Sequence, residues 1–143
     1  FNRKRSMAKQ EMLVALAGPL MNIIIALILT IILFAINTFA PSFTITMTGL
    51  IISLVLQMAI SVNIGLGIFN LIPLPPLDGS KIFINILPYK AKTWFQDNIQ
   101  IFYIIFVVLW VTNLMGYIIS PVISVVSKGI YELVSAIFGI FKL

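Results

Sequence analysis

Residues 70–79 read NLIPLPPLDG, a proline-rich run that ends in Asp78 and Gly79. A proline lacks a backbone N–H and pushes the residue before it toward an extended conformation, so we expect an apolar helix to end in this run. Gly79 permits a tight turn directly after the aspartate. The side chains that we expect to shape this loop are Pro73, Pro75, Pro76 and Gly79.

Asp78 is one of only four acidic residues, and residues 12–77 carry no charge at all. A carboxylate at the edge of so apolar a stretch is costly to desolvate, so it needs water, a partner or a metal. Three interpretations follow from the residues. Asp78 and Gly79 simply turn the chain. Alternatively, Asp78 carries protons in a small transporter. In the third, Asp78 is a metal ligand with Asn70 as a nearby hydrogen-bonding group, because a carboxylate oxygen suits zinc.

The composition predicts an all-α, multi-pass membrane protein with one membrane domain over residues 1–143. Of its 143 residues, 61% are hydrophobic and 9% charged, and the mean hydropathy is +1.15. These values lie far outside the range of soluble proteins. There is no cysteine, which excludes disulfides and thiolate metal sites, and no histidine. The net charge of +5 is interpreted as a topology signal beside a lipid bilayer, not as a nucleic-acid-binding surface.

Apolar runs of about 20 residues or more predict the membrane crossings. The carboxy-terminal segment, residues 122–143, has a different pattern: its polar residues recur mostly every three or four positions and leave an apolar face on the opposite side of a helix. Such a helix is expected to lie in the membrane interface. We therefore predict spanning helices over 12–40, 50–72 and 99–120, a cytoplasmic-side loop over 73–98, and an amphipathic interfacial helix over 122–143.

Basic residues predict the orientation in the cell membrane, since cytoplasmic loops carry an excess of Lys and Arg. Four of them precede the first spanning helix: Arg3, Lys4, Arg5 and Lys9. Two crossings later, the loop that holds Asp78 returns to the same side with Lys81, Lys90 and Lys92. Both the basic amino-terminal segment and the Asp78 loop are thus expected on the cytoplasmic side.

Two segments together resemble a known family. The pattern Asn-x-x-Pro-x-x-x-x-Asp-Gly, formed here by Asn70, Pro73, Asp78 and Gly79, resembles the second signature of the site-2 protease family of intramembrane zinc metalloproteases. The segment ALAGPLMN, residues 15–22, is similar to the Ala-Gly-Pro-x-x-Asn segment of the same family. The two segments occur in the family's order, and the resemblance covers nearly the first 90 residues.

The resemblance implies a zinc site and a role for each matching residue. In that family, two histidines of an HExxH helix and the aspartate of the Asp-Gly pair bind zinc, and the HExxH glutamate acts as general base. Asp78 would then be the third zinc ligand, and Asn70 would contact the substrate backbone or the developing oxyanion. The residues expected to position the site are Gly18, Pro19 and Asn22.

The chain departs from the family because it has no HExxH and therefore no catalytic base of its own. The two remaining zinc ligands are expected upstream of Phe1, so the chain is interpreted as the carboxy-terminal part of a longer protein. Glu11 has no histidine nearby and is expected to form an interfacial ion pair with Lys9 or a basic neighbour. The expected function is cleavage of transmembrane protein substrates in regulated intramembrane proteolysis. A non-catalytic membrane-binding protein of the same fold and a proton-coupled transporter using Asp78 remain the alternatives.

Overall fold

The computed structural model describes residues 2–141, whose regular structure is entirely α-helical. Helices α1, α3 and α7 are long and apolar enough to cross a membrane, and α5 with α6, bent by 65° at their junction, would make a fourth span. The predicted all-α, multi-pass class is confirmed. The helices are α1 (Asn2–Phe39), α2 (Pro41–Thr44), α3 (Met47–Asn70), α4 (Asp78–Ile86), α5 (Tyr89–Asp97), α6 (Ile99–Val111) and α7 (Leu114–Phe141).

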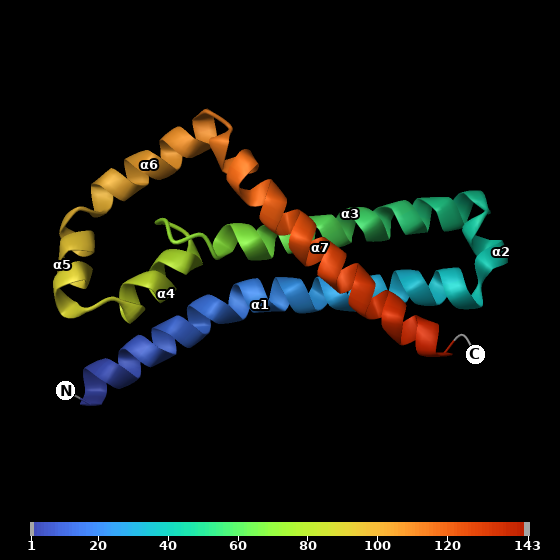
Figure 1. Ribbon diagram of the computed structural model, residues 1–143, viewed down its shortest axis with the longest axis horizontal. Coiled ribbons are helices and arrows are strands. Elements are labelled where there is room, and N and C mark those ends of the chain that lie inside the picture. The colour runs from blue at the N-terminus through green and yellow to red at the C-terminus, as the bar shows by residue number, and fades with distance from the viewer. Residues whose placement is uncertain (1, 142–143) are drawn as a thin grey trace.

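Helices α1 and α3 run antiparallel beside each other, joined at one end by α2, and α7 crosses both (Figure 1). Their contacts form the main apolar core. The side chains at its centre come from all three long helices and are Ala26, Leu33, Ile60, Ile64, Met115 and Val134. At the other end of this pair α4 packs beside α1, and α5 and α6 continue from α4 in an arc that leads to the start of α7 (Figure 1).

Gly67 allows α1 and α3 to approach closely. A Cβ atom at this position would lie 3.1 Å from the Pro19 carbonyl oxygen and 3.1 Å from Ile23 Cδ1, tighter than ordinary contact. Pro19 itself is buried inside α1, which continues through it as one helix. A proline inside a helix removes one backbone hydrogen bond and often kinks the helix, but α1 is not interrupted at Pro19, where it packs against α3.

Two polar side chains within the long helices, Thr30 and Asn63, form hydrogen bonds to the backbone of their own helix. Thr30, fully buried, donates from Oγ1 to the Ala26 carbonyl oxygen at 2.7 Å. Asn63 donates from Nδ2 to the Ala59 carbonyl oxygen at 2.8 Å. Because each bond stays within its own helix, these groups need no water, as a membrane interior requires.

The carboxy-terminal helices divide at a different place from the prediction. Helix α6 ends at Val111, whereas 99–120 was expected to be continuous, and α7 runs through Pro121 as one helix. The break falls at Asn113, whose φ of 63° is left-handed and is a conformation that Asn adopts more readily than most residues. Buried residues at both ends of α7, Met115 and Val134 among them, tie it to the core.

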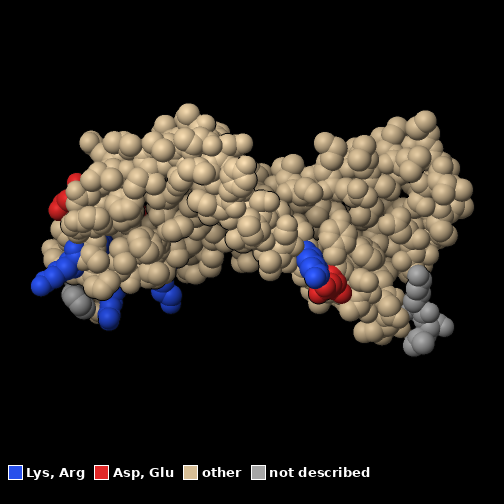
Figure 2. Space-filling view, turned by 45° about the horizontal axis from the view of Figure 1, so that its top comes forward, with Lys and Arg blue, Asp and Glu red and all other residues tan. Residues whose placement is uncertain are grey.

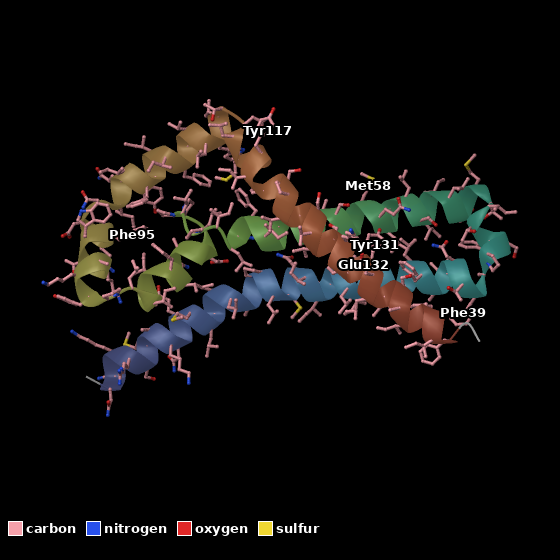
Figure 3. The ribbon with its side chains drawn as sticks, in the orientation of Figure 1. Phe39, Met58, Phe95, Tyr117, Tyr131 and Glu132 are labelled. Atoms are coloured by element: carbon pink, nitrogen blue, oxygen red, sulfur yellow. The ribbon has the colours of Figure 1, made fainter. Side chains whose placement is uncertain are left out.

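The other helix boundaries differ less from the predicted ones. The basic segment before residue 12 is already helical, so the first helix begins at Asn2. Within the expected loop 73–98, only a few residues are irregular and the remainder forms α4 and α5. Aromatic rings fix α5 in place: Phe95, only 2% exposed and labelled in Figure 3, stacks on Phe102 of α6 at 4.3 Å between ring centroids and meets Phe83 of α4 at 5.8 Å.

Candidate metal centre

The loop that leads to Asp78 is a series of tight turns. Within residues 71–77, the Leu74 N–H donates to the Ile72 carbonyl oxygen at 2.8 Å, and the Leu77 N–H donates to the Leu74 carbonyl oxygen at 2.9 Å. Of its prolines, Pro75 is buried while Pro73 and Pro76 are exposed. The prolines therefore end α3 and shape the loop in the way their covalent structure predicts.

Gly79 folds the start of α4 back onto the end of α3. A Cβ atom at Gly79 would overlap the carbonyl oxygens of Leu71 and Ile72, so no other residue fits without moving the backbone. Asn70, the last residue of α3, lies directly before this contact, and Asp78 directly before Gly79. The close packing of Gly79 against Leu71 and Ile72 thus brings together the two ends of the proline-rich run, residues 70–79.

Asp78 is the first residue of α4 and is half-buried. Its Oδ1 lies 3.9 Å from the Nζ atom of Lys81, with 37% of the Asp78 side chain and 52% of the Lys81 side chain exposed. An ion pair this long and this open contributes little to stability. The next turn is held by Ser80, which is buried and donates from Oγ to the Leu77 carbonyl oxygen at 2.7 Å.

The carboxylate of Asp78 lies opposite Gly18 of α1. A Cβ atom at Gly18 would stand 3.6 Å from Asp78 Oδ2, in van der Waals contact. Gly18 is exposed, whereas the adjacent Pro19 is buried against α3. One residue of the segment 15–22 therefore borders the carboxylate, and the next packs the helices together.

A cleft of about 300 Å³ opens beside Asp78 between α1 and α4. Glu11, for which the sequence predicts an ion pair with Lys9 or a basic neighbour, lies in this cleft. Its Oε2 instead accepts a hydrogen bond from Asn85 Nδ2 of α4 at 3.3 Å. The spacing of seven residues between Glu11 and Gly18, two helical turns, could have placed both on one face of α1. The lining residues are Met7, Gln10, Glu11, Val14, Ala15, Asp78 and Lys81.

The two asparagines of the family motifs are less constrained. Asn70 and Asn22 are both half-buried, and neither amide makes a hydrogen bond within residues 2–141. Asn22 lies one turn after Gly18 on α1, and neither asparagine lines the Asp78 cleft. The structure thus joins Gly18 to Asp78 and leaves the Asn70 amide free to bind another group.

Asp78 fits a metal as one ligand of a larger set. Zinc takes nitrogen, sulfur or carboxylate ligands, usually three from the protein when it is catalytic. Among residues 2–141 no three His, Cys, Asp or Glu side chains are grouped to hold a metal ion. The cleft offers only the carboxylates of Asp78 and Glu11, and the sequence contains no His or Cys. The chemistry fits zinc only with ligands from outside this sequence.

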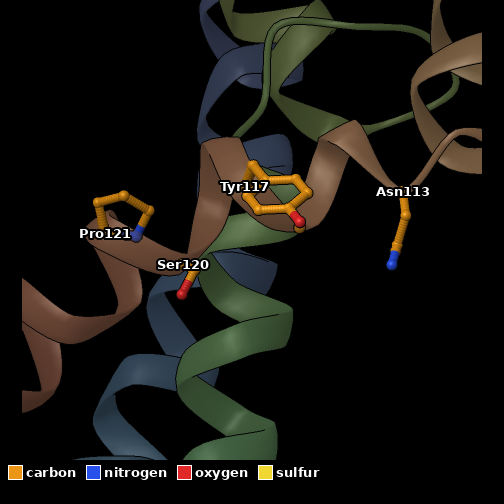
Figure 4. A pocket seen from close by; sticks show the side chains of 5 residues that line it. Asn113, Tyr117, Ser120 and Pro121 are labelled. Atoms are coloured by element: carbon orange, nitrogen blue, oxygen red, sulfur yellow. The ribbon is translucent and has the colours of Figure 1, made fainter.

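A hollow of about 350 Å³ at the turn between α6 and α7 has a different character (Figure 4). Its walls offer an amide, a phenol and a hydroxyl but no carboxylate. The lining residues are Asn113, Gly116, Tyr117, Ser120 and Pro121. Without an acidic group it is a poorer candidate for a metal centre than the Asp78 cleft.

Comparisons with known proteins show which family the chain is similar to. Residues 2–114 match the family model of peptidase family M50. The Bacillus subtilis (strain 168) protein named "Putative zinc metalloprotease YwhC" is 34% identical over 127 residues, which cover 88% of this chain and 57% of that protein. The chain thus spans a little over half the length of this relative. No solved structure gives a significant match.

Proposed function

The chain belongs to peptidase family M50, a family of zinc metalloproteases, and from this membership we propose that the protein containing it is an intramembrane zinc metalloprotease. It would hydrolyse peptide bonds within or near transmembrane segments of membrane protein substrates. In this proposal Asp78 is the third zinc ligand, and the other two ligands and the general base come from residues outside this sequence.

The observation that carries the proposal is the contact between Gly18 and Asp78. These residues are sixty positions apart in the sequence and belong to the two segments that resemble the family. In the structure Gly18 lies close to the Asp78 carboxylate, since a Cβ atom on Gly18 would stand 3.6 Å from Asp78 Oδ2, and Asp78 lines a cleft between α1 and α4. The Asp78 carboxylate is held there by only one long, exposed ion pair with Lys81, so it is available to another cation.

The remaining motif residues would support the reaction through position. Bound zinc polarises a carbonyl oxygen and lowers the pKa of its water. Asn70 has an amide N–H that is not used within residues 2–141, and it could donate to a substrate carbonyl oxygen as negative charge develops there. Gly79 and the prolines hold Asp78 at the start of α4, and the substrate helix must unwind before its peptide bonds are accessible.

We place this site near the cytoplasmic face of the cell membrane. The start of α1 and the lysines of α4 and α5 lie at one end of the molecule: Lys4 and Lys92 line the same hollow, about 440 Å³ in volume. Figure 2 shows Lys and Arg gathered at that end, apart from the ion pair of Lys128 and Glu132. Clustered basic residues favour the cytoplasmic side, which supports the proposed orientation.

The zinc content of the protein purified from its own cells tests the proposal. We expect about one zinc per molecule, and we expect Asp78→Asn to lose most of it because a neutral amide is a poor zinc ligand. Asp97→Asn is the matched control, since Asp97 is an exposed acid of α5 that does not line the Asp78 cleft.

Two results would refute the assignment. Zinc retained in full by Asp78→Asn would remove Asp78 from the ligand set. A wild-type protein free of zinc would favour the non-catalytic relative. If Asp78→Asn instead abolished a pH-dependent ion flux in reconstituted vesicles, with no zinc in either protein, the transporter alternative would take its place.

A further inference from the structure

The Asp78 cleft continues along α1 into a second hollow. This hollow, about 440 Å³, lies between the first turns of α1 and helices α4 and α5. Met7 and Glu11 line both hollows, so the two form one continuous groove, here called the α1–α4 groove. Its outer end is lined by Lys4, Met7, Ala8, Glu11, Asn85 and Lys92.

Helical spacing places polar side chains of α4 along the α1–α4 groove, whose α1 wall also contains the apolar Met7, Ala8, Val14 and Ala15. On α4, Asp78, Lys81 and Asn85 are three and four residues apart and share one face. Asn85 joins three helices: its Nδ2 donates to Glu11 Oε2 at 3.3 Å and to the Lys81 carbonyl oxygen at 2.8 Å. Its Oδ1 accepts from Lys92 Nζ at 3.4 Å. The walls of the groove are therefore fixed relative to one another.

The two ends of the groove differ in charge. The inner end contains Asp78 with its ion-pair partner Lys81, whereas the outer end contains Lys4 and the half-buried Lys92. Glu11, the single acid at the outer end, is already bound by Asn85. An ammonium group that is half-buried is less screened by water than an exposed one, so Lys92 attracts an anion more strongly.

We propose that the α1–α4 groove binds the extended substrate segment on the cytoplasmic side of the cleaved bond, and that its outer end selects an acidic side chain there. This inference rests on the proposed protease function. Gly18, level with Asp78, and Lys4 are fourteen residues apart on α1, which corresponds to roughly 21 Å at 1.5 Å per residue. An extended chain rises about 3.3 Å per residue, so the acidic side chain belongs about six residues from the cleaved bond.

A lipid phosphate would also be attracted to the lysines, but the rest of the groove fits it poorly. The outer end offers the carboxylate of Glu11 and the amide of Asn85, which can bond the N–H groups and carbonyls of a peptide backbone, whereas a phosphate has no N–H group to donate. The groove also leads directly to Asp78, which a headgroup held at the outer end would not use. A peptide therefore matches both ends of the groove.

Binding of three synthetic peptides tests the proposal without cleavage. Each peptide is a transmembrane segment broken by Gly-Pro, with Glu, Gln or Lys six residues toward the cytoplasmic end. The protein from its own cells is placed in neutral-lipid discs with a zinc chelator, and affinity is measured by fluorescence anisotropy. We expect the Glu peptide to bind about fivefold more tightly than the Gln peptide, the effect of one or two partly exposed ion pairs.

Charge variants show whether the groove causes this preference. In the double variant Lys4→Gln with Lys92→Gln, the two peptides should bind equally, and in Lys4→Glu with Lys92→Glu the Lys peptide should bind best. Lys128→Gln is the matched control because Lys128 pairs with Glu132 on α7, away from the groove, and it should keep the wild-type preference.

Equal binding of the Glu and Gln peptides to the wild-type protein would overturn the proposal. So would a preference that persists in the Lys4 and Lys92 double variant. If adding phosphatidylglycerol to the discs abolished the preference, and a labelled phosphatidylglycerol bound only while Lys4 and Lys92 were present, the outer end would be a lipid site. None of these failures would alter the zinc content, so they are distinguishable from failure of the proposed function.

Discussion

Two glycines determine the surroundings of Asp78: Gly79 follows it in the chain, and Gly18 faces it from α1. Gly79 fits because the carbonyl oxygens of Leu71 and Ile72 occupy the space of a side chain. Gly18 has room for a methyl group, but a longer side chain would occupy the space in front of the carboxylate. Gly79 sets the position of the aspartate, and Gly18 leaves the space in front of its carboxylate open.

Replacing Gly79 with alanine should displace α4 from the end of α3. The added methyl group overlaps two backbone oxygens, and relieving such overpacking costs about 1–3 kcal/mol of unfolding free energy. Denaturant unfolding of the detergent-solubilised protein measures this loss, and the same variant should also retain less zinc. Gly129→Ala is the control: nothing lies within 4 Å of that position on α7, so alanine there should raise stability by up to about 1 kcal/mol. Equal stabilities for the two variants would contradict this account of the turn.

The sequence predicted residues whose effect comes from their own covalent structure, such as the prolines, and a carboxylate that is rare in so apolar a stretch. It did not predict side-chain contacts that depend on how the helices pack. A run of prolines interrupts a helix in almost any context, so the loop was predictable. The partner of Glu11 was not, because Asn85 is reached only once α4 folds back against α1. Nothing in the local sequence of Glu11 distinguishes Asn85 from Lys9 as its partner.

Among the helices, α7 departs furthest from what its sequence indicated. Pro121 looked like a boundary, yet the helix continues through it and the break falls at Asn113. A proline inside a long helix removes one backbone hydrogen bond and can leave the helix continuous. A residue with left-handed backbone dihedral angles cannot continue a right-handed helix, so the helix is interrupted there. Boundaries of this kind depend on how α7 packs across α1 and α3, which periodicity does not reveal. Whether α7 lies in the interface, as its polar face predicts, stays a prediction.

The turn between α6 and α7 should respond to the backbone preference at position 113. Asn113→Ala places a residue with no local hydrogen bonding in the left-handed region, which costs about 1 kcal/mol, while Asn113→Gly should change stability by less than about 0.5 kcal/mol. Thermal unfolding of both variants in the same detergent measures the difference. A glycine variant as unstable as the alanine variant would show that the Asn113 side chain, and not its backbone conformation, holds the turn.

The whole molecule has the surface of a membrane protein. Its core is small, and large apolar side chains are exposed along the long helices, among them Val14, Leu54 and Val125 at 75%, 58% and 72%. Charged residues gather at the end that holds the start of α1 and helices α4 and α5 (Figure 2). Composition alone predicted this class, because burial in lipid requires apolar surface whatever the helix order. The crossing of α7 over α1 and α3 and the continuous α1–α4 groove depend on three-dimensional packing and could not be predicted in that way.

A change of the donor atom at position 78 tests the proposal that the Asp78 carboxylate binds a metal ion in the complete protein. Asp78→Cys replaces an oxygen donor with a thiolate, in a sequence that contains no other cysteine. In the cobalt-substituted protein from its own cells, we expect a new near-ultraviolet thiolate-to-cobalt charge-transfer band in this variant, absent from the wild type and from Asp97→Cys. If Asp78→Cys binds cobalt as the wild type does but shows no such band, position 78 does not contact the metal.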